Sequence, residues 1–221
     1  MKYLKKYSLY TQLIMPSPNY WKQSKEFLSN ADPKLAKLIS NHPEYCISSR
    51  GNALESLLRS IIGQQISVKA AASVWGKFEK KIEIIEPKNV LAVSFEELKS
   101  CGLSKQKVQY ITNICNHFIK NLITDHSYWK GRTYKSIYGE LITIKGVGPW
   151  TAEMFGMFYL LEKDIFPIKD VGIIRAVNQL YGNGKSLSIE NIIAISDTWR
   201  PYRSVACWFL WRSIDSEDVL Y

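Results

Sequence analysis

The sequence predicts an all-α protein. Apolar residues recur at helical spacing along most of the chain, and helix-capping residues stand directly before several of these segments. Period-2 alternation is scarce, and "KIEIIEP" is the one short candidate for a β-strand. At 221 residues, the chain is long enough for one large domain or two small lobes with a buried core.

Two helices are predicted near the start of the chain, over residues 18–30 and 33–41. Asp32 can cap the second helix, because its side-chain oxygen can accept from the first free amides. Pro33 suits the first helical position, where a missing N–H breaks no hydrogen bond. The pair is therefore predicted as two short helices separated by a tight corner.

The middle of the chain repeats this pattern. One helix, ended by Gly63, carries apolar residues at helical spacing: Leu54, Leu57, Leu58, Ile61 and Ile62. Ser67 can cap the Ala-rich helix that follows, and Ser94 with Glu97 forms a capping-box pattern. Ser104 precedes a further helix whose apolar face holds Val108, Ile111, Ile114, Cys115 and Phe118.

Two helices are predicted in the last third of the chain. Asp170 caps the first of them, "DVGIIRAVNQLYG", which stops at Gly182. The second is a final aromatic helix within "RPYRSVACWFLWRSI". No low-complexity tract or long repeat interrupts the order of helices.

Composition narrows the function classes. The net charge of +9 favours nucleic acid or another polyanion as partner. The four cysteines are far apart and, with three scattered histidines, give no metal-binding pattern, so we expect no cofactor and no metal. No apolar run approaches the ~20 residues of a membrane span and no secretion signal is evident, so we expect a cytoplasmic protein.

The segment "LITIKGVGPWTAEMF" at residues 141–155 breaks an apolar helical pattern at Gly146 and Gly148. We expect both glycines to allow positive φ and a close approach of the backbone to a ligand. Pro149 then suits the first position of a new helix. Amides of this turn and of the helix N-terminus would point outward, which favours an anion in front of them.

A lone Gly-x-Gly is more often a plain turn between helices. In a chain of net charge +9, however, a turn that opens onto a helix N-terminus favours a grip on a DNA phosphate. Lys145 adds positive charge, and Val147 lies between the two glycines. We therefore interpret residues 145–148 as DNA-binding.

Asp170 is the main catalytic candidate, although as the first residue of a helix it could be an N-cap and nothing more. Neighbouring Lys169 and the helix N-terminus favour its ionised form. An ionised carboxylate can stabilise developing positive charge or activate water. Asp164 is a second candidate, which we interpret as a structural residue of the loop.

Aromatic residues form a third signal. Trp150, Met154 and Phe158 fall on one face of the helix after the turn, and the C-terminal segment is crowded with Trp199, Tyr202, Trp208, Phe209 and Trp211. Core packing accounts for most of them. A few could instead line a cleft and hold a flat, electron-poor ring by stacking and cation–π attraction.

Taken together, these motifs resemble a known family. The run "LITIKGVGPWTAEMFGMFYLLEKDIFPIKDVGIIRAV" resembles the signature of the helix-hairpin-helix DNA glycosylases. "IIGQQISVKAA", "GLSKQKVQYI" and "WRPYRSVACWFLWR" are similar to the alkylpurine branch, 3-methyladenine DNA glycosylase II. The similarity runs from about residue 20 to about residue 213.

The resemblance implies two helical lobes with a DNA-binding cleft between them. One lobe would comprise residues 53–162, and the other would join residues 1–52 to 163–221. The partner would be double-stranded DNA that carries a damaged base, and we expect a monomer that binds no membrane. The resemblance also implies a compact member, without the β-rich N-terminal domain of some bacterial relatives.

The resemblance also assigns roles to site residues. Asp170 matches the catalytic aspartate, and Trp150 and Trp211 match aromatic walls of the base pocket, where we also place Met154 and Phe158. Gln65 would fill the gap left by a flipped nucleotide, although an exposed loop residue is the plain alternative. The hairpin with Gly146 and Gly148 would grip phosphate, and in the family it can hold a monovalent cation through its carbonyls.

Two features indicate hydrolysis without strand cleavage. Trp150 occupies the position where the bifunctional relatives carry a catalytic lysine, and the iron–sulfur cysteines of the endonuclease III branch are missing. The predicted function is therefore a monofunctional glycosylase in base excision repair that excises N-alkylated purines. The alternatives are a glycosylase for oxidised or mismatched bases and a non-catalytic DNA-binding module.

Overall fold

The computed structural model describes residues 17–43, 46–49 and 52–214. Within these ranges the chain is helical without any β-strand, which confirms the all-α prediction. The first half contains α2 (Trp21–Ala31), α3 (Pro33–Asn41), α4 (Ala53–Gly63), α5 (Val68–Ile82), α6 (Pro87–Ala92), α7 (Phe95–Ser100) and α8 (Lys105–Lys120). The second half contains a short 3₁₀ helix (His126–Tyr128), α9 (Tyr134–Leu141), α10 (Pro149–Phe158), α11 (Val171–Tyr181), α12 (Ile189–Asp197) and α13 (Arg203–Ile214).

The predicted caps position several of these helices. The side chains of Ser67, Ser94 and Ser104 each accept a hydrogen bond from the amide three residues later. The capping box between Ser94 and Glu97 is complete, and Gly63 is the last residue of α4. The short-range sequence signals therefore set these helix boundaries.

Asp32 does more than cap α3. Its Oδ1 accepts from the amides of Lys34 and Leu35, as predicted. Its Oδ2 also accepts from the hydroxyl of Tyr181 at 2.7 Å and from Nε1 of Trp199 at 3.0 Å. This carboxylate therefore joins the N-terminal helix pair to a segment far along the chain.

The predicted strand in "KIEIIEP" is wrong. Helix α5 continues to Ile82, tight turns follow, and Pro87 begins α6. Ile82 is buried and Ile85 is partly buried against the same core, whereas Ile84 is 63% exposed. The buried isoleucines are thus three residues apart, which suits a helix end and a turn better than the two-residue period of a strand.

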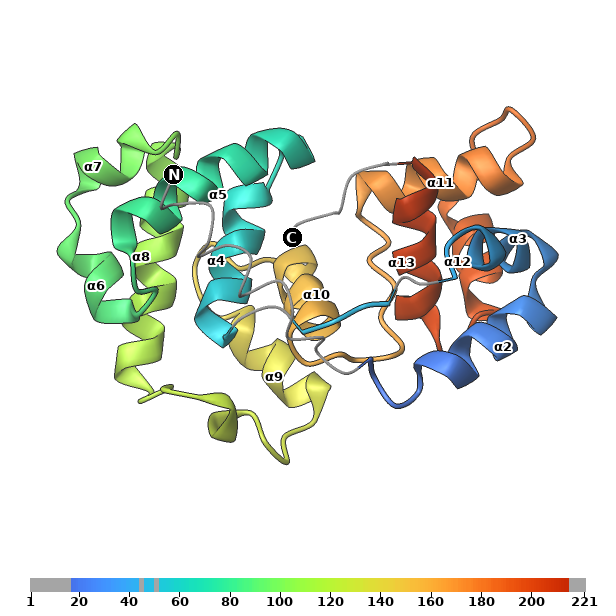
Figure 1. Cartoon of the computed structure of the whole chain (residues 1–221), viewed down its shortest axis with the longest axis horizontal. Helices are drawn as coiled ribbons and strands as arrows, with labels where there is room; N and C mark the ends of the chain where they lie inside the picture. Colours follow the sequence, from blue (N-terminus) through green and yellow to red (C-terminus); the bar gives the residue numbers. More distant parts are fainter. Residues whose placement is uncertain (1–16, 44–45, 50–51, 215–221) are drawn as a thin grey trace, which may run out of the picture.

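Helix α10 lies between two groups of helices in Figure 1, and the buried apolar residues form two clusters. One cluster draws only on residues between Ala53 and Tyr159, and the other combines α2 and α3 with the chain after α10. Helix α10 contributes Phe155 to the first cluster and Phe158 to the second. The exact lobe boundaries remain a prediction. Within the described ranges, no helix is long and apolar enough to cross a membrane.

Candidate active site

Asp170 lies at the N-cap of α11 with only 5% of its surface exposed. Its Oδ1 accepts from the Ile173 amide at 2.8 Å and from Nε1 of Trp211 at 3.0 Å. Its Oδ2 accepts from Nε1 of Trp150 at 2.7 Å. Three N–H donors therefore fix both oxygens, an arrangement that suits an ionised carboxylate placed to stabilise positive charge.

Three helices build this arrangement. Trp150 comes from the first turn of α10, Asp170 begins α11, and Trp211 lies near the end of α13. Gly172 lets the Trp211 ring come close to Asp170. A Cβ at this position would lie 3.0 Å from Oδ1 of Asp170 and 3.2 Å from the Trp211 ring. The sequence analysis did not single out Gly172. The available signal was a glycine two residues after Asp170, in the first turn of the predicted helix.

The four residues predicted for the base pocket differ in accessibility. Trp150 is partly exposed, whereas Met154, Phe158 and Trp211 are no more than 2% exposed and belong to one core cluster. The rings of Phe158 and Trp211 stack with centroids 5.8 Å apart. Trp150 is thus the member of the set with surface available for a ligand, and pocket roles for the others remain predictions.

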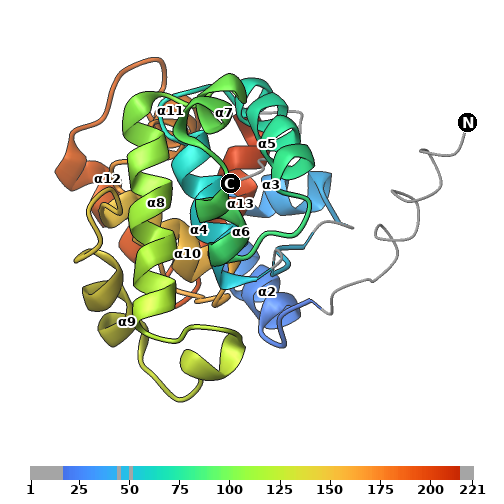
Figure 2. The same cartoon turned by 90° about the vertical axis from the view of Figure 1, so that its left-hand side faces the viewer.

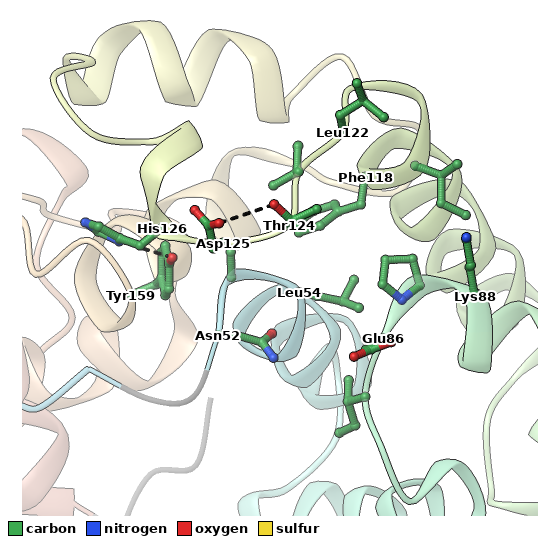
Figure 3. Close-up of a pocket in the computed structure, with 15 residues that line it drawn as sticks. Asn52, Leu54, Glu86, Lys88, Phe118, Leu122, Thr124, Asp125, His126 and Tyr159 are labelled. Carbon is green, nitrogen blue, oxygen red and sulfur yellow. Dashed lines mark hydrogen bonds between the residues drawn. The ribbon is translucent and has the colours of Figure 1, made fainter.

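A cavity of about 490 Å³ lies elsewhere, near α4, α6 and the end of α8 (Figure 3). Its walls include the apolar or aromatic side chains of Leu54, Phe118 and Tyr159 and the polar side chain of Asp125. None of the predicted site residues lines this cavity. It therefore does not serve the chemistry at Asp170.

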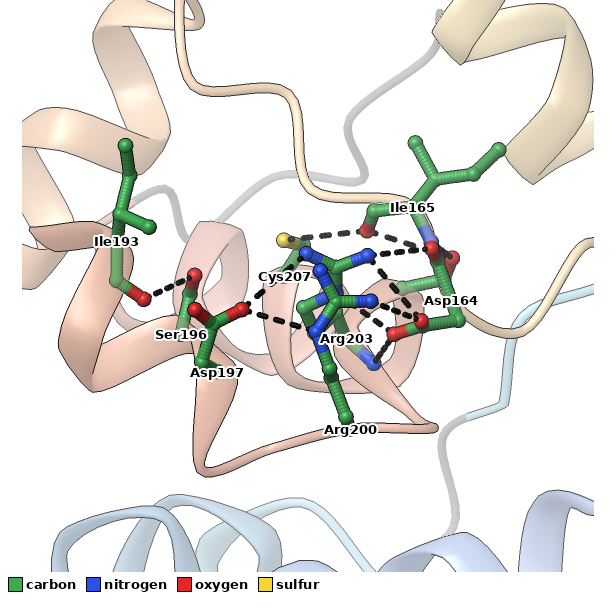
Figure 4. A network of polar contacts seen from close by, with 9 residues as sticks. Asp164, Ile165, Ile193, Ser196, Asp197, Arg200, Arg203 and Cys207 are labelled. Atoms are coloured by element: carbon green, nitrogen blue, oxygen red, sulfur yellow. Dashed lines mark hydrogen bonds and ion pairs between the residues drawn. The ribbon is translucent and has the colours of Figure 1, made fainter.

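Asp164 is bound to Arg203, the first residue of α13, and to Arg200 just before that helix (Figure 4). Its carboxylate pairs with Arg203 at 2.7 Å and with Arg200 at 2.9 Å. The backbone next to Asp164 is also bound to α13, since the Ser204 amide donates to the Lys163 carbonyl. These contacts agree with the structural interpretation of Asp164, because they anchor the loop before Asp170 to α13.

The predicted hairpin joins α9 to α10. Helix α9 ends at Leu141, earlier than the apolar pattern implied, and turns fill the chain up to Pro149, the first residue of α10. Gly146 has φ +109, and a Cβ there would lie 2.2 Å from the ring of Tyr110. The expectation of positive φ at both glycines is wrong, because Gly148 has φ −92 and leaves open space where its Cβ would be.

The amides of the hairpin are only partly available. Val147 is 4% exposed in the core, and its amide donates to the Ile144 carbonyl at 2.9 Å. In the described part of the chain, the amides of Gly146 and Gly148 donate to no protein acceptor. These two amides and the free first turn of α10 can face an anion, with the exposed side chain of Lys145 beside them.

Three carbonyls of the hairpin segment accept hydrogen bonds within the protein. Those of Leu141 and Ile144 accept from backbone amides, and that of Lys145 accepts from Nδ2 of Asn113 at 2.9 Å. A monovalent cation held by other carbonyls of the hairpin stays a prediction. Among the described residues there is no cluster of metal-binding side chains.

Gln65 is exposed on the loop between α4 and α5 and has φ +58. Its neighbour Gln64 donates from Nε2 to the hydroxyl of Thr151 on α10 at 3.0 Å. Nζ of Lys107 donates to the carbonyls of Ile62 at 2.7 Å and Gln64 at 2.9 Å. Burial lowers the pKa of Lys107. Lys107, which sequence reasoning missed, holds this loop in place.

Helix α8, which stands in front of α4 and α10 in Figure 2, contacts both predicted DNA-binding elements. Lys107 holds the loop with Gln65, Tyr110 packs against Gly146, and Asn113 binds the Lys145 carbonyl. These three residues recur at three-residue intervals, which places them along one side of a helix. The loop and the hairpin are therefore fixed relative to each other.

Glu153 is a second carboxyl group near Asp170 that sequence reasoning missed. It lies on α10 three residues after Trp150 and is partly buried. Burial, and then the charge of Asp170, raise its pKa to about 7, while Lys169 opposes the shift. Its helical spacing from Trp150 was the available signal.

The chain is similar in sequence and in structure to several known proteins. Over 210 residues the chain is 27% identical to the alkylbase DNA glycosidase-like protein mag2 of Schizosaccharomyces pombe, spanning 90% of this chain and 96% of that protein. A solved structure of the 3-methyladenine DNA glycosylase Mag1 of Schizosaccharomyces pombe with abasic DNA has a TM-score of 0.80 and 25% identity, covering 86% of this chain and 96% of that one. A DNA-3-methyladenine glycosidase from Bacillus halodurans has a TM-score of 0.69 and 34% identity, covering 86% and 87%.

Residues 58–201 also match the family described as HhH-GPD superfamily base excision DNA repair protein. This range contains the hairpin, Trp150 and Asp170, which are the features that carried the resemblance. The helical fold and the long coverage of the relatives agree with the match. The chain therefore belongs to the HhH-GPD superfamily of base excision DNA repair proteins.

Proposed function

We propose that this chain is a monofunctional DNA glycosylase that removes N-alkylated purines, of the 3-methyladenine and 7-methylguanine type, from duplex DNA. The observation that carries the proposal is the buried carboxylate of Asp170, held by three N–H donors. Phosphate binding alone would require no such group. Relatives named as 3-methyladenine glycosylases support the same substrate class.

DNA is held by its backbone. The free amides of Gly146 and Gly148, the N-terminus of α10 and Lys145 contact phosphates without reading sequence. The net charge of +9 adds long-range attraction. We place the bound duplex across the two elements that α8 supports, so that Gln65 enters the base stack beside the gripped phosphate.

The target nucleotide rotates out of the duplex. Flipping costs a few kcal/mol, and less where damage has weakened pairing or stacking. Gln65 fills the vacated space, and the partly exposed ring of Trp150 stacks on the extruded base. An N-alkylated purine carries positive charge, which strengthens its attraction to an indole face.

Asp170 acts on the sugar. A cationic purine departs as a neutral base, and the sugar develops oxocarbenium-like positive charge. The fixed carboxylate stabilises that charge while water adds to C1′. The two indole donors keep the carboxylate in place, so little reorganisation is needed when the charge develops.

Trp150 supports hydrolysis without strand cleavage. A lyase needs an amine that forms a Schiff base with the sugar, and the resemblance puts that amine at this position. Here the position holds an indole that donates to Asp170. Water is therefore the nucleophile.

Asp170→Asn should lower release of free base from methylated duplex DNA, identified by mass, by at least ~10²-fold. The amide keeps an oxygen for Trp211 and Ile173 but presents an N–H₂ group to the Trp150 donor and carries no charge. Affinity for DNA should remain within a few-fold. Near-normal activity of this variant would show that the wrong carboxylate is assigned, and Asp164→Asn would then test the other candidate.

Damaged duplex incubated with the protein should yield an abasic site and an intact strand until alkali is added. Borohydride should trap no covalent adduct, because Trp150 supplies no amine. Gel electrophoresis before and after alkali, with borohydride in a parallel sample, measures both results. A trapped complex would refute the monofunctional assignment.

Gly148→Ala should weaken binding to damaged and undamaged duplex by similar factors, several-fold at low salt. The added methyl group meets no protein atom within 4 Å, so it stands where a phosphate approaches and leaves the fold intact. Gly139→Ala on α9, equally free of contacts, is the control. Fluorescence anisotropy measures the affinities, and a loss confined to damaged DNA would argue against backbone contact.

Gln65→Ala should process a paired lesion several-fold more slowly, yet approach normal rates when the lesion lies opposite an abasic gap. Lys107→Met should show the same pattern, because it releases the loop carbonyls, whereas Lys105→Met removes an exposed charge of the same helix. Single-turnover rates on both duplexes measure the effect. Equal defects on both duplexes for Gln65→Ala, or none, would leave Gln65 an ordinary loop residue.

A further inference from the structure

Glu153 lies on the side of α10 that faces the Asp170 site. The residues around it on this helix are buried, whereas Trp150 and Glu153 are partly exposed and one helical turn apart. Trp150 donates to Asp170, so the same face of α10 carries Glu153 toward that carboxylate. Among the described residues, the Glu153 carboxyl has no hydrogen bond or ion pair. The negative charge of Asp170 nevertheless acts on it and raises its pKa.

Asp170 and Lys169 are the charged groups that face Glu153 from the segment that leads into α11. Asp170 disfavours a second negative charge and Lys169 favours one, so their effects oppose each other. Burial is the largest influence, and the outcome is a pKa of about 7. Glu153 therefore keeps its proton to a higher pH than an ordinary glutamate does.

The other titratable groups that interact with Glu153 are uncharged at neutral pH. They are the hydroxyls of Tyr134 and Tyr138 on α9 and the buried thiol of Cys207 on α13. In each case burial is the first cause of a raised pKa. None of the three groups therefore supplies the positive charge that would hold Glu153 in its ionised form.

We propose that Glu153 is the proton donor to the departing base when the target purine carries no charge of its own. The proposal rests on the proposed glycosylase function and adds a second catalytic residue to it. Two neighbouring carboxyl groups with opposite ionisation are a recurring way to separate acid and electrostatic roles. Asp170 stabilises the sugar cation, and Glu153 supplies the proton.

Departure of an uncharged purine as a neutral base requires one proton. The C1′–N bond breaks, its electron pair moves onto the purine, and the Glu153 carboxyl proton transfers to a ring nitrogen. The base leaves neutral, and the sugar becomes an oxocarbenium ion beside Asp170. Water adds to C1′ and releases one proton, which restores the Glu153 acid through solvent.

Base charge therefore decides whether Glu153 is needed. A 7-methylguanine is already cationic and leaves as a neutral base without a proton from the protein. Hypoxanthine is neutral and would leave as an anion unless it is protonated. Loss of a positioned general acid typically lowers a rate by about 10²- to 10⁴-fold.

Single-turnover rates of Glu153→Gln should separate these two cases, on duplexes that carry one 7-methylguanine or one hypoxanthine. At pH 6.5 hypoxanthine release should fall by about 10²-fold, and 7-methylguanine release should stay within a few-fold. In the parent, hypoxanthine release should decline as pH rises through about 7, because the donor loses its proton, and the variant should lack that decline. Glu162→Gln, a partly buried carboxyl just beyond α10 with a raised pKa, is the control and should behave as the parent.

Thermal unfolding tests the ionisation independently of activity. The native pKa of about 7 lies above the usual 4.5, so between these values the native state binds more protons than the unfolded state and stability falls as pH rises. Glu153→Gln removes this loss. The variant should therefore melt higher than the parent at pH 8, and the gap should close at pH 4.5.

Equal losses on both duplexes, an unchanged hypoxanthine rate, or a parent that releases 7-methylguanine but no hypoxanthine would each overturn the role of Glu153 alone. A parent that releases neither base would overturn the glycosylase proposal as well. A melting difference that does not change with pH would refute the ionisation on which the donor depends.

Discussion

The hydrogen bonds that two indoles donate to Asp170 are the interaction on which the site depends. Trp150 and Trp211 come from different helices, α10 and α13, and meet on a carboxylate that begins a third, α11. A buried carboxylate is costly unless donors compensate for its lost hydration. The packing of these three helices therefore sets the orientation of the Asp170 carboxylate.

Predictions succeeded where the signal was local. Asp32, Ser67, Ser94 and Ser104 cap helices because an N-cap depends only on residues within one turn. The bend at Gly146 followed from the same logic, although its requirement for glycine also involves Tyr110 from another helix. The strand in "KIEIIEP" failed because seven residues cannot distinguish a helix end from a short strand without knowing which side is buried.

The site was predictable in part. Asp170 and Trp150 could be named from sequence, but the hydrogen bond between them could not, because it depends on how α10 and α11 pack. Lys107 appears in sequence as one of many lysines, and only the fold shows its ammonium between two loop carbonyls. Glu153 was missed for a similar reason, since the groups around it come from three other segments of the chain.

The two core clusters differ in how their residues are distributed along the sequence, and this difference has a consequence for folding. The cluster between Ala53 and Tyr159 can form from a continuous stretch of chain, so its loop-closure entropy is modest. The other must bring α2 and α3 to partners beyond α10, through contacts such as that of Asp32 with Trp199, which are 167 residues apart. Because contacts of long sequence separation form slowly, we expect the continuous cluster to fold first and to present α10 as a surface for the second. Asp170 would then acquire the hydrogen bond from Trp211 only as the last part of the chain closes.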